Sequence, residues 1–442
     1  AINAGRSPIG GVEPDIDRVV AESAAAGLLD ASHDYTAARD ADVILICTQT
    51  DKRGMAPDYG PLTEALEGIA SQLAQRPAGN VPLIVFESTL APSSMATVVR
   101  DLFARHGLVE GRDVLLGNSP NRVMPGRLVE RVASSDKLVA GLHPDTPGLI
   151  ARLYQRIVTR GRLHQTNSMT AEVVKTLENA YRDVRIAYAA EVVRHCDAHD
   201  IGFFALRDRV NARLQQSDTA SADPNAVPSG GLLVPMLGVG GHCLPKDGIL
   251  LWWRALEAEQ PSQRSLILES RRINDEAPAW TLARIEALFG PVAGRRVALL
   301  GAAYRFDSED TRNSPTLVLA RLLLERGASV VIHDPYVYET DQNLRRTGLT
   351  AHFSRDLDGV LSQAEIVVLC TGHKIYRDRR DAILDAAPHA TGVFDACNLW
   401  PAQAVRGRGR QYGGIGRGAA EAPDALVDAV LAGFRAIETG VG

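Results

Sequence analysis

Short apolar runs that end in small polar residues constrain the fold of this chain more than any other feature. In the first third, "ADVILICT", "VPLIVFEST" and "RDVLLGNSP" alternate with amphipathic stretches such as "PDIDRVVAESAAAGLL". Buried strands that alternate with helices are typical of parallel sheets, because the crossover between parallel strands is usually a helix. The pattern therefore predicts an α/β fold with a parallel sheet.

The same alternation returns near the C-terminal end, in "RRVALLGAAY", "SVVIHDP", "EIVVLCTG" and "GVFDACN". Between the two parts lies "MTAEVVKTLENAYRDVRIAYAAEVVRHCDAHD", about thirty residues without Gly or Pro, longer than a typical globular helix. We predict two Rossmann-like parallel-sheet domains joined by a central helical domain with a long connecting helix. Their predicted bounds are residues 1–163, 164–268 and 269–442.

Composition excludes several classes of function. The 442 residues carry 48 Lys and Arg against 53 Asp and Glu, and this net charge of −5 provides no basic field for nucleic acid. The apolar runs, such as "VILIC" and "VALLG", are too short to span a bilayer. The five cysteines are scattered and form no CxxC pair, which argues against a disulfide framework or a zinc site. We expect a cytoplasmic protein with no nucleic acid, membrane or metal partner.

The stretch "GVGGHCLPKD" is the strongest candidate for a catalytic site. Its glycines allow a tight turn close to a ligand, and Asp247 can cap the apolar helix that follows. The start of that helix and the neighbouring Lys246 both favour the thiolate form of Cys243. Most lone cysteines are small buried residues, and we assign that role to the other four. For Cys243 the coincidence of glycine turn, helix start and charge favours a nucleophile.

A second candidate lies in "AEVVKTLENAY", within the expected long helix. Lys175 and Asn179 are four residues apart and therefore share one helix face. A lysine and an amide on one face can stabilise the oxyanion that forms when a thiol attacks a carbonyl. The alternative is an ordinary solvated ion pair between Glu172 and Lys175.

Together these segments resemble the UDP-glucose/GDP-mannose dehydrogenase family, the nucleotide-sugar 6-dehydrogenases. The resemblance covers nearly the whole chain. It implies an NAD-dependent, four-electron oxidation of the C6 hydroxyl of a UDP-sugar to a uronic acid, as in polysaccharide biosynthesis, through a thiohemiacetal and a thioester on cysteine. It also implies that the three predicted domains bind NAD, form a dimer and bind the UDP-sugar, respectively. The segments that stand in the family's order are "INAGRSPIGGVEPDID", "FESTLAPSSM", "SPNRVMPG", "AEVVKTLENAY", "GVGGHCLPKD", "RRINDEAP", "DTRNSP" and "GGIGRG".

The resemblance also implies roles for individual residues. Cys243 matches the nucleophile, and Asp247 matches a carboxylate that orders the catalytic water. The implied catalytic residues are Cys243, Lys175, Asn179, Asp247, Thr89 and Asn121. The implied cofactor-binding residues are Thr50, Thr89 and Arg312, of which Arg312 is also implied to contact the nucleotide sugar. The implied substrate-binding residues are Lys175, Asn179, Gly240, Gly241 and Arg305.

Three departures from the family pattern stand out. Asn121 occupies the position of a family glutamate and cannot act as a base at neutral pH. Arg305 replaces a lysine, and its planar guanidinium suits a diphosphate. No G-x-G-x-x-G occurs, and the chain begins with Ala, so we expect an N-terminal segment of roughly forty to fifty residues, somewhat more than one βαβ unit, to precede it. Without that segment, the strands "VILIC" and "LIVFE" would lack a neighbour and leave an exposed edge.

Two other functions compete with the active dehydrogenase. A non-catalytic homologue that binds nucleotide sugars but has lost NAD binding would account for Asn121 and the missing glycine loop. A two-electron β-hydroxyacid dehydrogenase would share the Lys-x-x-x-Asn helix, but it needs neither Cys243 nor the "DTRNSP" segment. Within the family, "GVGGHC" resembles the branch that oxidises UDP-N-acetylmannosamine or UDP-N-acetylglucosamine.

The long helix is also predicted to form a homodimer interface, because its apolar positions cover more surface than a domain connector requires. These positions are Val173, Val174, Leu177, Val184, Ile186, Ala187 and Ala190.

Overall fold

The computed structural model describes residues 1–9, 13–77, 79–123, 127–220, 230–234, 236–257 and 265–417. The chain forms two compact units, Ala1–Asp183 with His242–Glu269, and Val184–Gly241 with Ser270–Gly442. One boundary between the units falls within the long helix, and another falls just before Cys243. The division into three domains at residues 163 and 268 stays a prediction.

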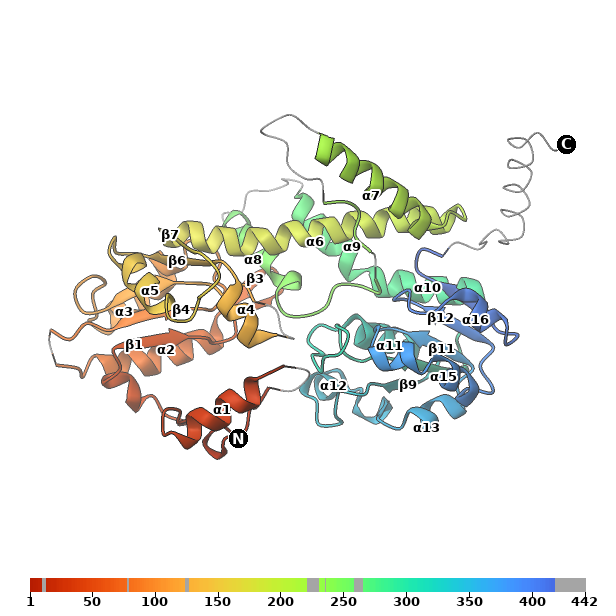
Figure 1. Ribbon diagram of the computed structural model, residues 1–442, viewed down its shortest axis with the longest axis horizontal. Coiled ribbons are helices and arrows are strands. Elements are labelled where there is room, and N and C mark those ends of the chain that lie inside the picture. Colours follow the sequence, from red (N-terminus) through yellow and green to blue (C-terminus); the bar gives the residue numbers. More distant parts are fainter. Residues whose placement is uncertain are drawn as a thin grey trace. The chain divides into compact units, whose positions relative to one another are not determined.

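In the described residues, the first unit contains a five-stranded mixed sheet (Figure 1). In order across the sheet, its strands are β1 (Val43–Ile46), β4 (Leu83–Phe86), β5 (Leu115–Asn118), β6 (Lys137–Gly141) and β7 (Leu163–Asn167). All neighbours pair in parallel except β5 and β6, which run antiparallel. A separate hairpin pairs β2 (Asp51–Arg53) with β3 (Ala56–Asp58). The helices before the long one are α1 (Ile16–Ala25), α2 (Gly60–Leu73), α3 (Arg100–Arg105), α4 (Leu128–Ser134) and α5 (Thr146–Tyr154), with a π-helical turn, η3 (Met95–Val99).

Alternate residues of β4 pack on opposite faces of this sheet, as the two-residue period of a strand requires. Ile84 and Phe86 join a core with Leu66 of α2, whereas Val85 joins a core with Ile150 of α5. All four residues of β4 are buried, so both faces of this strand are covered. This arrangement explains why "VPLIVFEST" is a continuous apolar run.

Of the two strands expected to form an exposed edge, β1 lies at the edge of the sheet in the described part of the chain and β4 does not. The expectation that "LIVFE" lacks a neighbour is wrong, because β4 pairs with β1 on one side and with β5 on the other. β1 pairs with no further strand of the described residues, and its side chains Val43 and Leu45 are 39% and 47% exposed.

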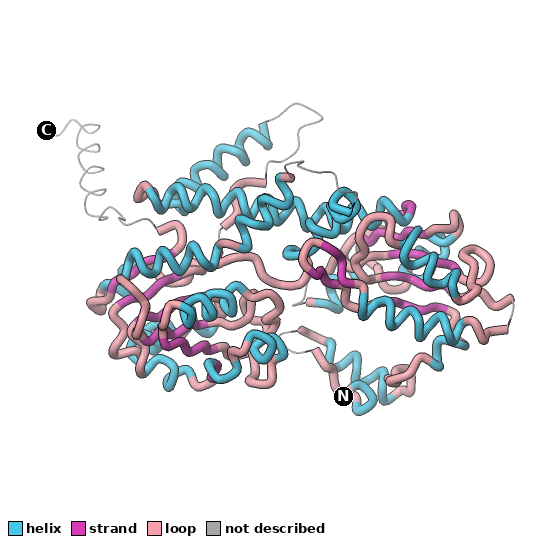
Figure 2. The backbone as a smooth tube through the Cα atoms, turned by 180° about the vertical axis from the view of Figure 1, so that it is seen from behind, coloured by secondary structure: helices cyan, strands magenta, loops and turns pink. Residues whose placement is uncertain are grey.

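The predicted long helix is confirmed as α6 (Ser168–Ala198), which both ribbon and tube views show unbroken (Figures 1 and 2). The predicted helix after the glycine turn is α8 (Leu244–Glu257), which begins directly after Cys243. The expectation that Asp247 caps this helix is wrong, because the helix starts three residues earlier and Asp247 lies within its first turn. Further helices of this region are α7 (Phe203–Ala220), α9 (Leu266–Asp275) and α10 (Ala277–Phe289). Among the described helices, none has both the length and the apolar character needed to cross a membrane.

The second unit contains a six-stranded parallel sheet within the described part of the chain, which confirms the expected Rossmann-like fold. The strand order is β10-β9-β8-β11-β12-β13, so successive connections reverse direction between β8 and β11, where ligands of open α/β sheets bind. The strands are β8 (Arg296–Leu300), β9 (Ser329–His333), β10 (Phe353–Ser354), β11 (Ile366–Leu369), β12 (Gly392–Asp395) and β13 (Gln411–Gly414). The helices are α11 (Pro315–Glu325), α12 (Gln342–Thr347), α13 (Leu357–Ser362), α14 (Lys374–Asp378), α15 (Arg380–Ala386) and α16 (Ala402–Arg406).

Helices cover both faces of this second sheet. Along β8, Leu299 packs in a core with Leu323 of α11, and Leu300 packs in another core with Leu361 of α13 and Leu384 of α15. The carboxyl ends of β8, β9 and β11 thereby lie on a rigid scaffold, from which the loop that carries Arg305 and Arg312 extends.

Candidate active site

Cys243 lies at the N-terminus of α8. Its carbonyl oxygen accepts hydrogen bonds from the backbone N–H groups of Lys246 (3.2 Å) and Asp247 (2.9 Å), and its side chain is half-buried. A thiol in this position has the helix N-terminus beside it and remains accessible to a ligand.

The other cysteines differ from Cys243 in their surroundings. Burial raises the pKa of the Cys370 thiol to about 12 and also raises the pKa values of Cys196 and Cys397, so these thiols stay protonated at neutral pH. The expectation that all four are buried is wrong for Cys47, which is exposed just after β1, the edge strand of the sheet in the described residues. Cys397 is half-buried, so the expectation holds for it only in part.

The helices α6 and α8 bring together three of the polar side chains around the candidate site. Asn179 Nδ2 donates to Asp247 Oδ2 at 2.6 Å, and Lys246 Nζ lies 2.7 Å from Asp247 Oδ1. The Lys246 and Asp247 side chains are only 1% and 0% exposed, and Lys175, one turn before Asn179, is 6% exposed. The ammonium of Lys246, expected to favour the thiolate, is thus paired with Asp247.

Glu172 has a different role from the expected solvated ion pair. It is 2% exposed, and its carboxylate accepts hydrogen bonds from the backbone N–H groups of Ser93 (2.7 Å) and Met95 (2.8 Å). The solvated ion pair is therefore wrong, because the carboxylate is buried against the turn that leads into η3. Glu172 holds the segment that follows Thr89, and nothing in its sequence spacing distinguishes this contact from a surface pair.

Thr50 and Thr89 follow the neighbouring strands β1 and β4. The hydroxyl of Thr50, which is 2% exposed, donates to the carbonyl oxygen of Thr89 at 2.7 Å. The structure thus brings the two threonines together at the carboxyl ends of parallel strands, the edge at which dinucleotides bind in such sheets.

Asn121 lies in the loop after β5. Its side-chain oxygen accepts from the backbone N–H of Val123 at 2.8 Å, and its own N–H donates to the carbonyl oxygen of Glu87 at 3.0 Å. The Glu87 carboxylate forms an ion pair with Lys137 at 2.8 Å and accepts a hydrogen bond from the hydroxyl of Tyr154. Asn121 therefore stabilises a local turn, and the neighbouring carboxylate, which sequence analysis did not single out, is occupied by two partners.

The implied substrate-binding residues of the second unit lie on one loop and on the glycine turn. Arg312 forms a two-point ion pair with Asp310 (2.9 and 2.5 Å), and the half-buried Arg305 has its guanidinium 5.7 Å from the ring centroid of Phe306. The backbone N–H of Gly241 donates to the carbonyl oxygen of Arg312 at 2.8 Å.

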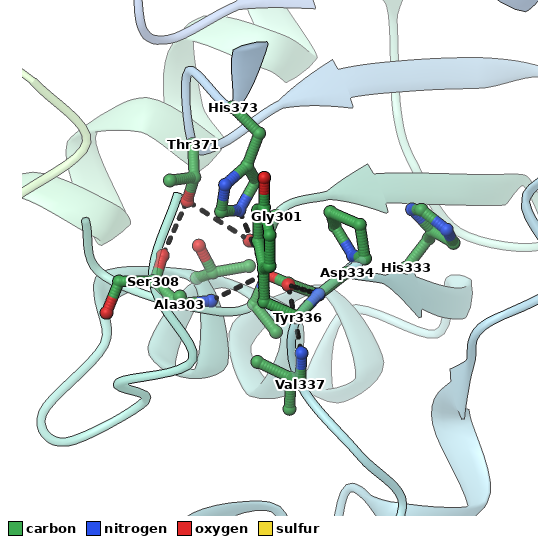
Figure 3. A network of polar contacts seen from close by, with 12 residues as sticks. Gly301, Ala303, Ser308, His333, Asp334, Tyr336, Val337, Thr371 and His373 are labelled. Atoms are coloured by element: carbon green, nitrogen blue, oxygen red, sulfur yellow. Dashed lines mark hydrogen bonds and ion pairs between the residues drawn. The ribbon is translucent and has the colours of Figure 1, made fainter. Parts of the chain in front are cut away.

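A buried carboxylate anchors the start of this loop (Figure 3). Asp334 Oδ2 accepts from the backbone N–H groups of Ala302 (2.8 Å) and Ala303 (3.0 Å) and lies 3.0 Å from His373 Nε2. Burial alone would raise the pKa of Asp334, but the hydrogen bonds from His373 and the backbone outweigh it and hold that pKa below its usual value. Asp334 is thus an ionised internal anchor for the residues that follow β8.

The neighbouring His333 gives this unit a pH-dependent stability. Burial lowers its pKa to about 4, and its Nδ1 lies 2.7 Å from the hydroxyl of Tyr376. Between about pH 6.5 and pH 4 the unfolded chain binds a proton that the folded chain does not, so the free energy of unfolding falls as the pH is lowered. We expect His333 to contribute a loss of about 2 kcal/mol between pH 7 and pH 5. In urea unfolding, the difference in the free energy of unfolding between pH 7 and pH 5 should be smaller by this amount in His333→Phe than in the wild type.

The matched control for this prediction is His389→Gln, which alters an exposed histidine of the same unit. The free energy of unfolding of this variant should change between pH 7 and pH 5 by as much as that of the wild type. Equal pH dependence in His333→Phe and the wild type would contradict the assignment of this effect to His333.

Comparison with known proteins extends over most of the chain. Residues 1–158 match the NAD binding domain of the UDP-glucose/GDP-mannose dehydrogenase family, residues 169–276 match its central domain, and residues 298–402 match its UDP binding domain. A UDP-N-acetyl-D-mannosamine dehydrogenase of Pyrococcus horikoshii is 31% identical over 422 residues, which cover 94% of this chain and 90% of that protein. An Escherichia coli K12 protein of the same name is 29% identical over 416 residues, with 90% of each chain covered.

Solved structures agree with this result. The structure of the Pyrococcus horikoshii UDP-D-ManNAc dehydrogenase is similar to this chain with a TM-score of 0.78 and 29% identity, covering 95% of this chain and 91% of that one. An NDP-N-acetyl-D-galactosaminuronic acid dehydrogenase from Methanosarcina mazei has a TM-score of 0.75 and 29% identity, covering 94% and 86%.

Proposed function

Because this chain belongs to the UDP-glucose/GDP-mannose dehydrogenase family, we propose that it oxidises C6 of a UDP-N-acetylhexosamine to a carboxylate through a thioester on Cys243. The chain is an NAD-dependent nucleotide-sugar dehydrogenase. The acetamido sugar as substrate is supported by the names of its relatives, which include UDP-N-acetyl-D-mannosamine dehydrogenases of two organisms.

The reaction conserves atoms and electrons over two oxidation steps. The alcohol loses a hydride and a proton to become an aldehyde, and the Cys243 thiol adds to that aldehyde to form a thiohemiacetal. Loss of a second hydride from C6, together with the hydroxyl proton of the thiohemiacetal, gives the thioester, and water then releases the carboxylate and regenerates the thiol. Bound NAD⁺ would accept each hydride, so one uronic acid corresponds to two NADH.

The residues at the carboxyl ends of β1 and β4 fit a dinucleotide. Ligands of open α/β sheets bind at these strand ends, where the buried hydroxyl of Thr50 holds the backbone of the half-buried Thr89. We assign these two residues to the cofactor side of the reaction.

The observation that carries the proposal is the hydrogen-bonded pair of a buried carboxylate and a half-buried amide at the start of α8. Asn179 and Asp247 are joined at 2.6 Å, and Asp247 N–H donates to the carbonyl of Cys243. With Lys175 on the same face of α6, these groups can stabilise the oxyanion and order the hydrolytic water next to the thiol. Because Asn121 cannot act as a base, we assign the ordering of that water to Asp247.

The stoichiometry of the reaction tests the proposed function. Incubation of the protein with NAD⁺ and a panel of UDP-sugars should produce two NADH for each uronic acid, measured by absorbance and by mass spectrometry of the product. One NADH for each product, with free aldehyde accumulating, would contradict the thioester route. Absence of NADH with every UDP-sugar, together with measurable UDP binding, would favour the non-catalytic homologue.

We also propose a homodimer built on α6. Leu177, Tyr181 and Tyr188 are 48%, 60% and 60% exposed, and their spacing of four and seven residues places them along one stripe of the helix. Of the apolar positions expected at this interface, Ala187 and Ala190 are instead buried within the chain itself, at 1% and 8% exposure.

Sedimentation velocity at micromolar concentration should therefore show a dimer, and Tyr181→Glu should shift it to the monomer, because a charge in the stripe costs desolvation energy. Tyr338→Glu, at an exposed aromatic residue elsewhere in the chain, is the matched control and should remain dimeric. A monomeric wild-type protein would contradict this proposal.

A further inference from the structure

The loop between β8 and α11 forms hydrogen bonds with both the backbone N–H and the backbone carbonyl of Gly241 in the glycine turn. Gly241 N–H donates to the carbonyl oxygen of Arg312 at 2.8 Å, and Asn313 Nδ2 donates to the carbonyl oxygen of Gly241 at 2.9 Å. Asn313 has a left-handed backbone (φ 48°), a conformation that asparagine adopts more readily than most residues. With its backbone in this conformation, Asn313 directs its side-chain amide toward Gly241 in the turn.

The aromatic ring of Tyr304, from the same loop, packs against the turn. A Cβ atom added at Gly240 would lie 2.4 Å from Tyr304 Cβ, and one added at Gly241 would lie 2.8 Å from Tyr304 Cζ. Such distances leave no room for any side chain, so glycine is required at both positions by this close approach. Gly241 also has a φ of 86°, which L side chains rarely adopt.

The loop that makes these contacts is itself fixed at its start. Asp334 accepts hydrogen bonds from the backbone of Ala302 and Ala303, and the hydroxyl of Thr371 donates to the carbonyl oxygen of Ala303 at 2.5 Å (Figure 3). Further along, the backbone N–H of Asp307 donates to His373 Nδ1 at 2.8 Å. These contacts hold the loop independently of the glycine turn, so the loop can act as a rigid support for that turn.

We propose that Asn313 and Tyr304 are positioning residues that hold the Gly240–Gly241 turn and thereby set the path by which the chain enters Cys243. Cys243 follows Gly241 by two residues, so the backbone of the turn restricts where the thiol can lie. The same loop carries Arg312, whose carbonyl oxygen holds Gly241 and whose side chain is assigned to the nucleotide sugar under the proposed function. This inference rests on the proposed function for the identity of the nucleophile.

The reactivity of Cys243 toward iodoacetamide tests the proposal without any turnover. Asn313→Asp keeps the shape and the left-handed backbone but replaces the donor with an acceptor facing a carbonyl oxygen, and Asn313→Gly removes the side chain. Peptide mass spectrometry would follow the alkylation of Cys243, with the exposed Cys47 as an internal reference. Asn398→Asp is the matched control, because Asn398 is also left-handed (φ 53°) and exposed in the same unit.

We expect both Asn313 variants to change the alkylation rate of Cys243 by about fivefold or more, with the rate of Cys47 unchanged, because a released turn exposes the thiol more often. Asn398→Asp should behave as the wild type. Tyr304→Ala should give the same change as the Asn313 variants, and Tyr304→Phe, which keeps the ring, should restore the wild-type rate. Wild-type rates at Cys243 in both Asn313 variants would overturn the proposal, and so would an equal change at Cys47.

Steady-state kinetics distinguish two roles of Asn313: positioning the thiol of Cys243, and supporting Arg312 in substrate binding. Asn313→Asp should lower kcat about tenfold and leave KM for the UDP-sugar within about twofold, because the chemical step is affected more than binding. A raised KM with unchanged kcat would overturn the proposal in favour of a role in substrate binding. If the wild type forms no NADH, the proposed function fails, whereas unchanged alkylation in an enzyme that does turn over refutes this inference alone.

Discussion

Replacement of Cys243 by alanine is expected to lower the rate of uronic acid formation by at least about 10³-fold. Without the thiol, the aldehyde cannot form a thiohemiacetal, and the second hydride has no covalent intermediate from which to leave. The first oxidation requires no covalent bond to the protein, so NADH should form at no more than one equivalent for each sugar. Absorbance at the NADH band and mass spectrometry of the sugar measure these two quantities separately.

Cys397→Ala is the control for this variant, because it removes a half-buried thiol of the second unit that takes no part in the proposed chemistry. It should retain wild-type kcat within about twofold. Normal uronic acid formation by Cys243→Ala would show that Cys243 is structural and that the thioester route is wrong.

The strands and the long helix could be predicted because their patterns are local. The apolar runs give β1, β4 and β5 in the first unit and β8, β9, β11 and β12 in the second, and the stretch without Gly or Pro gives α6. Hydrophobic periodicity indicates which faces of a segment are buried. It does not indicate whether a strand runs parallel or antiparallel to its neighbour. The antiparallel pairing of β5 with β6 depends on a connection through α4 and has no signature within either strand.

The site was predictable as a set of residue types but not as a set of contacts. Asn179 and Asp247 are 68 positions apart, and their hydrogen bond exists only because α6 and α8 pack together. For Glu172, the sequence predicted a contact that is not the important one. Its spacing from Lys175 suggested a local ion pair, whereas its carboxylate accepts hydrogen bonds from backbone groups 77 and 79 positions away. Helix spacing identifies residues that share a face, and it cannot identify what that face meets.

The side chains of Lys246 and Asp247 provide the second large effect. They lie 2.7 Å apart at 1% and 0% exposure, so removing either partner leaves a buried charge without its counterion. Asp247→Asn is expected to lower kcat at least about 100-fold and to lower the free energy of unfolding by about 3 kcal/mol. Lys246→Met, which keeps the length of the side chain without its charge, should destabilise the fold by a similar amount.

The double variant Lys246→Met with Asp247→Asn separates the structural role of Asp247 from its catalytic role. Because both charges are then absent, most of the lost stability in urea unfolding should return, and the coupling energy from the four proteins measures the buried pair. The kcat for uronic acid formation should stay as low as in Asp247→Asn, since the carboxylate that binds Asn179 and orders the water is still missing. Recovery of kcat together with stability would mean that Asp247 serves only to neutralise Lys246, and the base for thioester hydrolysis would then have to be another group.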